Sequence, residues 1–387
     1  MKLIKNAHII TCAGKEIENG VIAFDEKIRF VGKTYTEPVS ETIDAKRHYV
    51  LPGLIDAHCH AGLFCDSLGF EGADGNEASD PATPQLRAID GIYPQDRAFA
   101  DARAVGITTV VTGPGSANAI GGQFAAIKTA GICIDDMIIK APCAMKIALG
   151  ENPKTVYHEK DEAPVTRMGT IAIIREMLYK AKNYMAAVEK HKNDPEGCDA
   201  PDFDIKLDAL LPVLRREIPV KAHAHRADDI CSAIRLGKEF GIDITIEHCS
   251  DGDVIADILE REGVPVNIGP TLIDRSKPEL RNLSFATYRN LCERGLSVAI
   301  ITDHPEITIE NLPLCAALAT EHGMDKLQAM YAVTINAARN CRIADRVGSL
   351  EKGKDADIVI YDKLPSEFGA RCIRTLINGK ECYNSEI

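Results

Sequence analysis

The sequence of 387 residues has no apolar run near the ~20 residues that a membrane-spanning helix needs. Its start, Met-Lys-Leu-Ile-Lys-Asn-Ala, lacks the longer apolar core of a secretory signal peptide. It also lacks an excess of positive charge, because 45 Lys and Arg against 57 Asp and Glu give a net charge of −12. Phosphate backbones and anionic lipids need basic patches. We therefore expect a cytoplasmic protein that binds neither nucleic acid nor membranes.

Cysteine is plentiful, but its spacing has no pattern. The thirteen cysteines are odd in number and form no Cys-x-x-Cys pair, which argues against a disulfide framework and against a structural zinc knuckle. Cys133, Cys143 and Cys231 lie in apolar stretches, where we expect small buried side chains.

The two ends of the chain share a β-rich pattern. Residues 1–50 contain several short apolar runs separated by Gly, Asn and Lys turns, and similar runs return at 357–361 and 374–378. Each end alone has too few strands to bury a core. The pattern predicts one small β-sandwich built from residues 1–50 and 344–387.

Residues 51–343 alternate between β-runs and helical patterns, about eight times in all. This alternation is typical of parallel strands joined by helical crossovers, and barrel closure leaves no unpaired edge strand. We predict an α/β fold, a (β/α)₈ TIM-type barrel with a small β-sandwich. The alternative is an open doubly wound sheet, but no Gly-x-Gly-x-x-Gly follows a strand.

A pair of histidines ends the first predicted barrel strand. His58 and His60 are two residues apart, so on an extended chain their side chains leave the same face. Two imidazoles on one strand face can converge on a divalent cation. The alternative is two surface histidines at a strand end.

Other metal-binding residue types occur at or near the ends of further predicted strands. His223, His248 and Asp303 each end a strand, and Lys146 and Glu151 bracket the end of another. The carboxyl ends of barrel strands lie at one face of the barrel, where active sites form. The pattern predicts that these side chains meet in one metal site.

Several segments resemble the amidohydrolase superfamily. Pro-Gly-Leu-Ile-Asp-Ala-His-Cys-His (52–60) is similar to its first-strand metal motif. Lys-Ala-His-Ala-His-Arg (221–226) and Thr-Ile-Glu-His (245–248) look most like the imidazolonepropionase-like and metallo-dipeptidase branch, and residues 348–359 carry another superfamily signature. The resemblance covers nearly the whole chain and implies one or two metal ions at the mouth of the barrel.

Carried over position by position, the resemblance implies the ligand roles. One metal ion would be held by His58, His60 and Asp303, and a second by His223 and His248.

The ligand that would bridge the two ions has two candidates. Some members of the superfamily use a carboxylated lysine, which Lys146 matches, and others use a glutamate after a strand, which Glu151 matches. An anion is needed between two cations, so Lys146 qualifies only if it is carboxylated. We favour Glu151 slightly and keep both.

The ligand set suits Zn²⁺, our first expectation, and also Mn²⁺, Fe²⁺ or Ni²⁺. Such ions lower the pKa of a bound water from ~16 towards ~7. Asp303 would take the proton of the attacking water and deliver it to the departing nitrogen.

Three residues are candidates for binding the substrate. His225 points the same way as His223 and would donate a hydrogen bond to the substrate carbonyl, unless it only supports the site from behind. Arg167 and Arg226 suit a carboxylate of the substrate, unless they are solvated surface charges.

The favoured function is a metal-dependent amidohydrolase that cleaves a carbon–nitrogen bond of a small amide, which leaves dipeptides, N-acyl amino acids and cyclic amides open. The alternative is a metal-dependent deaminase on the same scaffold. A non-catalytic barrel is disfavoured because the ligand set is retained. Homo-oligomers are compatible with such a barrel, although the sequence identifies no interface.

Overall fold

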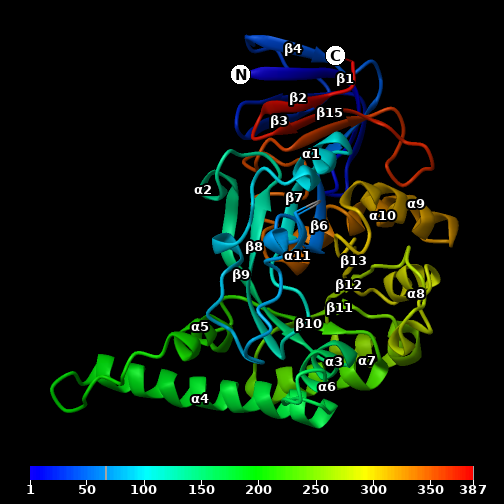
Figure 1. The fold of residues 1–387 in the computed structure, drawn as a ribbon. Helices are drawn as coiled ribbons and strands as arrows, with labels where there is room; N and C mark the ends of the chain where they lie inside the picture. Colours follow the sequence, from blue (N-terminus) through cyan, green and yellow to red (C-terminus); the bar gives the residue numbers. More distant parts are fainter. Residues whose placement is uncertain (66–67, 387) are drawn as a thin grey trace.

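Two eight-stranded sheets organise the computed structural model, which describes residues 1–65 and 68–386 (Figure 1). The first sheet has the order β16-β15-β14-β5-β1-β2-β3, with β4 paired to β1. Its strands are β1 (Lys2–Ile10), β2 (Glu16–Phe24), β3 (Ile28–Gly32), β4 (Glu41–Asp44), β5 (Tyr49–Pro52), β14 (Ile358–Tyr361), β15 (Cys372–Ile377) and β16 (Lys380–Asn384).

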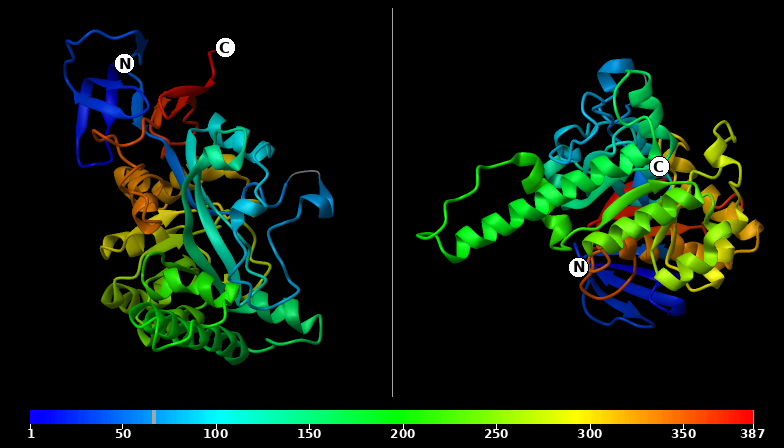
Figure 2. Two further views of the ribbon diagram at one scale, coloured as in Figure 1. Left: turned by 90° about the vertical axis from the view of Figure 1, so that its left-hand side faces the viewer. Right: turned by 90° about the horizontal axis from the view of Figure 1, so that it is seen from below.

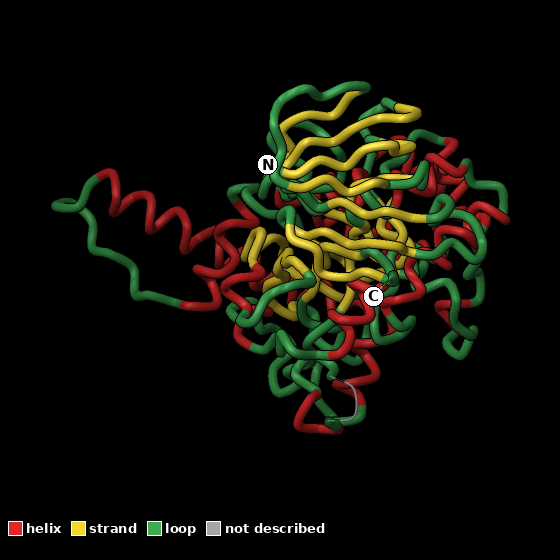
Figure 3. The backbone as a smooth tube through the Cα atoms, turned by 90° about the horizontal axis from the view of Figure 1, so that it is seen from above, coloured by secondary structure: helices red, strands yellow, loops and turns green. Residues whose placement is uncertain are grey.

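Both ends of the chain contribute to this first sheet, as predicted. β5 pairs antiparallel with β14, with Pro52 opposite Ile358. The sheet encloses its own apolar core, in which Ile4, Phe24 and Leu376 are fully buried. The N- and C-terminal strands therefore form one domain at one end of the molecule (Figure 1, Figure 3).

The second sheet is the barrel, with strands in sequence order from β6 to β13. They are β6 (Leu54–Cys59), β7 (Ile107–Thr112), β8 (Ile120–Lys128), β9 (Ile138–Ala148), β10 (Val220–Ala224), β11 (Ile244–His248), β12 (Val266–Ile268) and β13 (Val298–Ile300). Two backbone hydrogen bonds tie β6 to the segment after β13, Asp303 N–H to His58 O (3.1 Å) and His60 N–H to His304 O (2.8 Å). The predicted barrel with a β domain from both termini is confirmed.

The barrel departs from strict strand–helix alternation at β8. β8 runs antiparallel to both β7 and β9, and the sequence pattern predicted no strand over 120–128. The Gly113-Pro114-Gly115 turn sends the chain straight back along β7 without a crossover helix.

Helices cover the barrel and form one projecting arm. They are α1 (Arg97–Ala104), α2 (Ile134–Met137), α3 (Glu151–His158), α4 (Arg167–Asn193), α5 (Ile205–Leu214), α6 (Ala227–Phe240), α7 (Ala256–Glu262), α8 (Ala286–Glu293), α9 (Leu312–Glu321), α10 (Lys326–Ala332) and α11 (Ile335–Asn340). The far end of α4, with the chain that returns to α5, extends away from the barrel (Figure 2). Among the described residues, no helix is both long and apolar enough to cross a membrane.

All thirteen cysteines are free thiols. Cys143 is buried, as expected, but the expectation was wrong for Cys133, which is exposed, and for Cys231, which is partly exposed. Both lie where a helix begins or faces solvent, and an apolar neighbourhood in sequence did not bury them.

A buried ionic cluster joins the barrel to the β domain. Lys128 of β8 lies 2.8 Å from Asp355 and 2.5 Å from Asp357, and all three side chains are almost completely buried. Lys27 and Arg346 also pair with Asp355. Burial alone would raise the pKa of Asp355, but these cations lower it from 3.8 to about 2.

We expect Lys128→Met to lower the free energy of unfolding by about 3–5 kcal/mol, because it leaves the buried Asp357 carboxylate without its cation, whereas Asp355 keeps Lys27 and Arg346. Urea denaturation at pH 7 measures this. In the wild type, the contribution of Asp355 is complete above about pH 4 and is lost as the pH falls towards 2, since its folded pKa is depressed. Lys180→Met, which breaks an exposed pair with Glu176, is the control and should change stability by less than about 1 kcal/mol. Equal effects of the two substitutions would contradict the assignment.

Candidate metal centre

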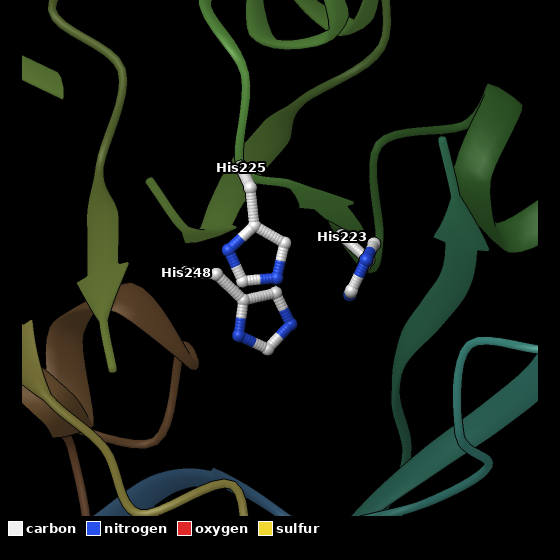
Figure 4. Close-up of side chains that lie close together, drawn as sticks. All are labelled: His223, His225 and His248. Carbon is white, nitrogen blue, oxygen red and sulfur yellow. The ribbon is translucent and has the colours of Figure 1, made fainter. Parts of the chain in front are cut away.

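Two groups of potential metal ligands meet at the carboxyl ends of the barrel strands. One group is His58, His60 and Asp303, and the other, shown in Figure 4, is His223, His225 and His248. Within each group the ligand atoms lie within 4.8 Å of one another. Asp303 Oδ1 is 3.2 Å from His60 Nε2 and 3.5 Å from His58 Nε2. The predicted meeting of distant strand ends therefore occurs in the structure.

Backbone turns at the strand ends aim two of these side chains inward. His248 and Asp303 have φ values of 76° and 56°, in the left-handed region. Such a conformation costs a non-glycine residue about 1–3 kcal/mol and is frequent at functional sites. The barrel closure holds Asp303 in place, since its N–H donates to the carbonyl of His58.

The hydrogen bonds of the histidines leave lone pairs facing the centre. His60 Nδ1 donates to the carbonyl of Gly113 and His248 Nδ1 to that of Gly269, both at 2.7 Å. Each Nε2 therefore carries a lone pair. That of His60 faces the Asp303 carboxylate, and that of His248 is buried without a hydrogen-bond partner among the described residues. Lone pairs turned towards one another in a buried site fit a bound cation.

The protonation states suit metal binding. Burial, together with nearby cations, holds the pKa values of His58, His223 and His225 well below the usual range, so these imidazoles are neutral. Burial alone would raise the pKa of Asp303, but the surrounding histidines and Lys146 lower it to about 2. A neutral imidazole set with one ionised carboxylate is a set of ligands for Zn²⁺ and similar ions.

The two candidates for a bridging ligand occupy different places. Lys146 is fully buried in the cluster, with Nζ 3.1 Å from His58 Nε2, and burial lowers its pKa to about 8. Glu151 begins α3 and lines the cavity above, and its N–H donates to Glu279. Only Lys146 of the two has a side-chain contact with a ligand histidine in the described structure.

Sequence reasoning missed Glu247, which supports His58 from behind. Its carboxylate is fully buried 3.2 Å from His58 Nδ1, and it accepts hydrogen bonds from Lys221 (3.0 Å), Asn267 (3.0 Å) and Thr245 (2.6 Å). A carboxylate beside Nδ1 keeps the proton on that nitrogen and leaves Nε2 free to bind. The Thr-Ile-Glu-His segment places Glu247 next to a ligand, but nothing local indicates that it reaches across the barrel to β6.

A cavity of about 580 Å³ opens above the two groups. His60, His223, His225 and Asp303 line it, and its walls come from the long segments after β6 and β9 and from the loop after β12. Phe64, Asn152 and Lys277 are examples from these three walls.

The structure places the predicted substrate-binding residues differently. His225 lines the cavity, with Nδ1 2.8 Å from Ser250 Oγ, and also belongs to the second ligand group. His225 follows His223 by two residues, as His60 follows His58, and this spacing in the sequence could have indicated a ligand role for it. Arg167 pairs with Asp229 (3.0 Å) and Arg226 with Asp228 (2.9 Å), and neither lines the cavity. Among the described residues, Lys277 is the basic side chain that lines the cavity.

Comparisons with known proteins agree with this geometry. The sequence profile of the amidohydrolase family matches residues 49–382. The structure is similar to the crystal structure of an amidohydrolase from Thermotoga maritima, with a TM-score of 0.95, 39% sequence identity, and coverage of 99% of this chain and 100% of that one. Amidohydrolase tasK of Hapsidospora irregularis is 28% identical over 89% of this chain, which spans 37% of that protein's length. The imidazolonepropionase of Clostridium tetani is 24% identical, covering 97% of this chain and 91% of the relative.

We expect Glu247→Gln to have two separable effects. It leaves the buried Lys221 ammonium without its charge partner, which should lower stability by about 3–5 kcal/mol. It also removes the carboxylate behind His58, which should weaken binding of Zn²⁺ by about 10–100-fold. Chemical denaturation and competition with a chromophoric chelator measure the two effects.

The double variant Glu247→Gln/Lys221→Met separates these effects. Removing the stranded ammonium should restore most of the stability but not the affinity for Zn²⁺. Recovery of the affinity as well would show that Glu247 only balances charge.

Proposed function

Because the chain belongs to the amidohydrolase family, we propose that this hydrolase uses one or two divalent metal ions to cleave a carbon–nitrogen bond of a small amide. The observation that carries the proposal is the approach of Asp303 to His58 and His60, from opposite ends of the barrel sequence, at the floor of an open cavity. Zn²⁺ is our first choice of ion on the ligand set.

A divalent ion bound at this site would lower the pKa of a bound water from ~16 towards ~7. It would also supply a positive charge for the substrate carbonyl oxygen. His58, His60 and Asp303 would hold one ion, and His223 with His248 a second. All of these side chains are buried, so the ions would be held at the floor of the cavity by groups that are largely shielded from solvent.

Asp303 is the group placed to move the proton. Its carboxylate is ionised, because its pKa is lowered to about 2, and it lines the cavity. In our proposal it accepts the proton of the attacking water and returns it to the departing nitrogen. His225, whose ring also lines the cavity, would hydrogen-bond the carbonyl oxygen.

Lys146 is our candidate for an anionic bridge after carboxylation. Burial lowers its pKa to about 8, so roughly a tenth of its side chains carry the neutral amine at pH 7, far more than for an exposed lysine. The amine nitrogen would bond to the carbon of CO₂, release one proton and become a carbamate anion. That anion would replace a positive charge beside His58 with a negative one.

The substrate class stays open between dipeptides, N-acyl amino acids and cyclic amides. Lys277 lines the cavity and would meet a substrate carboxylate, whereas Arg167 and Arg226 are engaged elsewhere. Metal analysis of the purified protein, with a screen of these three amide classes, tests the proposal. A metal count near one per chain would favour the alternative, a deaminase.

Asp303→Asn should lower kcat by about 10²–10⁴-fold, because the amide cannot accept the water proton. The rate is measured with the best substrate from the screen, on protein whose metal content and circular dichroism match the wild type. Unchanged turnover in a metal-loaded Asp303→Asn variant would refute the role of this carboxylate.

Lys146→Met and Glu151→Gln distinguish the two bridging candidates. We expect Lys146→Met to lower the metal content, since no anion then stands between the ions, and Glu151→Gln to leave it unchanged. Mass spectrometry of the native protein should also detect a carbamate on Lys146 when bicarbonate is present. The reverse order of effects would assign the bridge to Glu151.

A further inference from the structure

A second carboxylate, which no sequence motif indicated, lies behind the histidines of β10. Glu279 sits in a short 3₁₀ turn, η4 (Pro278–Leu280), on the loop that follows β12, and it is 1% exposed. Its Oε1 is buried without a hydrogen-bond partner among the described residues. That oxygen is 3.9 Å from His223 Nε2 and also 3.9 Å from His225 Nε2.

Among the described residues, no lysine or arginine forms an ion pair with Glu279, although the charge of Lys277 acts on it from two residues away. The other Glu279 oxygen accepts only the N–H of Glu151, at 3.2 Å. The nearby Arg167 pairs with Asp229, and Lys277 donates to Asn152 (3.0 Å). Within residues 1–65 and 68–386, Glu279 forms no ion pair with lysine or arginine. A buried unpaired carboxylate is costly, so a group that is absent from the polypeptide is the natural partner.

The distances fit a cation better than direct hydrogen bonds. At 3.9 Å the imidazole nitrogens are too far from Oε1 to donate to it. Ligand atoms bonded at about 2.0–2.2 Å to one tetrahedral ion lie roughly 3.3–3.6 Å apart. A shift of a few tenths of an ångström therefore brings Oε1 to ligand spacing from each imidazole. The ligand atoms of the two histidines lie within 4.8 Å of each other.

Charge balance favours the same arrangement. The group of His58, His60 and Asp303 contains a carboxylate, whereas the second group contains three imidazoles and no anion. Even with a carbamate on Lys146, two neighbouring divalent ions and the Asp303 carboxylate would keep a net positive charge, which a further anion reduces. Asp303 reaches the second group only at His248, with Oδ2 3.8 Å from Nδ1, whereas Glu279 lies 3.9 Å from both His223 and His225.

We propose that Glu279 is the anionic ligand of a second divalent cation, bound together with Nε2 of His223 and Nε2 of His225. In this arrangement His225 is a metal ligand in the place given above to His248, and it does not hydrogen-bond the substrate carbonyl. The ion is of the Zn²⁺, Mn²⁺ or Fe²⁺ class, as the mixed imidazole and carboxylate ligands require. This inference rests on the metal dependence proposed above. It also ties the loop after β12, which contributes Ile273 and Lys277 to the cavity wall, to the metal centre.

The test compares Glu279→Gln with the wild type and with Glu306→Gln. Glu306 is the control because it lines the same cavity and is exposed, and its carboxylate forms no hydrogen bond or ion pair with either ligand group among the described residues. Only its backbone N–H reaches one of them, donating to the carbonyl of Asp303 (3.0 Å), and the substitution leaves that bond in place. Metal-free proteins are titrated with Zn²⁺ against a chromophoric chelator, and bound zinc is counted by elemental analysis. We expect two ions per chain in the wild type and in Glu306→Gln. Glu279→Gln should keep one ion and bind the other at least about 100-fold more weakly.

Thermal unfolding gives a second readout that a purely structural role would not produce. Without metal, Glu279→Gln should unfold at the same or a higher temperature than the wild type, because a buried unpaired charge is removed. With Zn²⁺ bound, the order should reverse, because only the wild type gains the stabilisation from the second ion. Should Glu279→Gln fail to fold, Glu279→Asp replaces it, with two ions expected and the second bound more weakly.

The outcomes separate this inference from the proposed function. Two ions bound with unchanged affinity by Glu279→Gln would overturn the role of Glu279. A single ion in the wild type would also overturn it and would favour the deaminase alternative, but it would not contradict metal-dependent hydrolysis. A wild type that binds no metal would contradict both.

Discussion

The contact between the first barrel strand and the segment after the last one is the constraint on which the rest of this structure depends. Two backbone hydrogen bonds close the barrel there, and the Asp56 carboxylate accepts from both the N–H and the hydroxyl of Thr302. The same contact brings Asp303 to 3.2 Å from His60. Closing the barrel and assembling the site are therefore a single event. A chain that failed to join these two strands would lose the metal centre before it lost most of its secondary structure.

The barrel interior keeps its charges in balance over a short distance. Lys221 and Glu247 neutralise each other, and Glu247 also faces His58. The ammonium groups of Lys146 and Lys221 both lie over the Phe124 ring, 5.7 and 5.9 Å from its centre. Buried ion pairs of this kind add little net stability, since desolvation offsets much of their attraction. Their effect is to hold each imidazole in one tautomer with its lone pair aimed at the centre.

The cavity walls come from parts of the chain that the barrel leaves free to vary. The segments after β6, β9 and β12 supply Phe64, Asn152 and Lys277. Loops at the carboxyl ends of barrel strands set substrate choice in such folds, while the strands hold the chemistry. The family therefore identifies the reaction class, and the loops of this chain decide which substrate enters.

The sequence by itself determined the parts that depend on local periodicity. The spacing of His58 and His60 on an extended strand, and the positions of His223, His248 and Asp303 at strand ends, follow from a two-residue repeat and from strand–helix alternation. The β domain built from both termini was equally predictable, because neither end alone has enough strands to bury a core. Only the tertiary structure decided the contacts around the ligands, because contacts across the barrel cannot be predicted from local sequence periodicity. It placed Glu247 beside His58 and Glu279 beside two histidines, put Lys146 rather than Glu151 against a ligand, and paired Arg167 and Arg226 with aspartates away from the cavity. Each of these depends on which distant side chains share a small buried volume, and that is set by how the whole barrel packs.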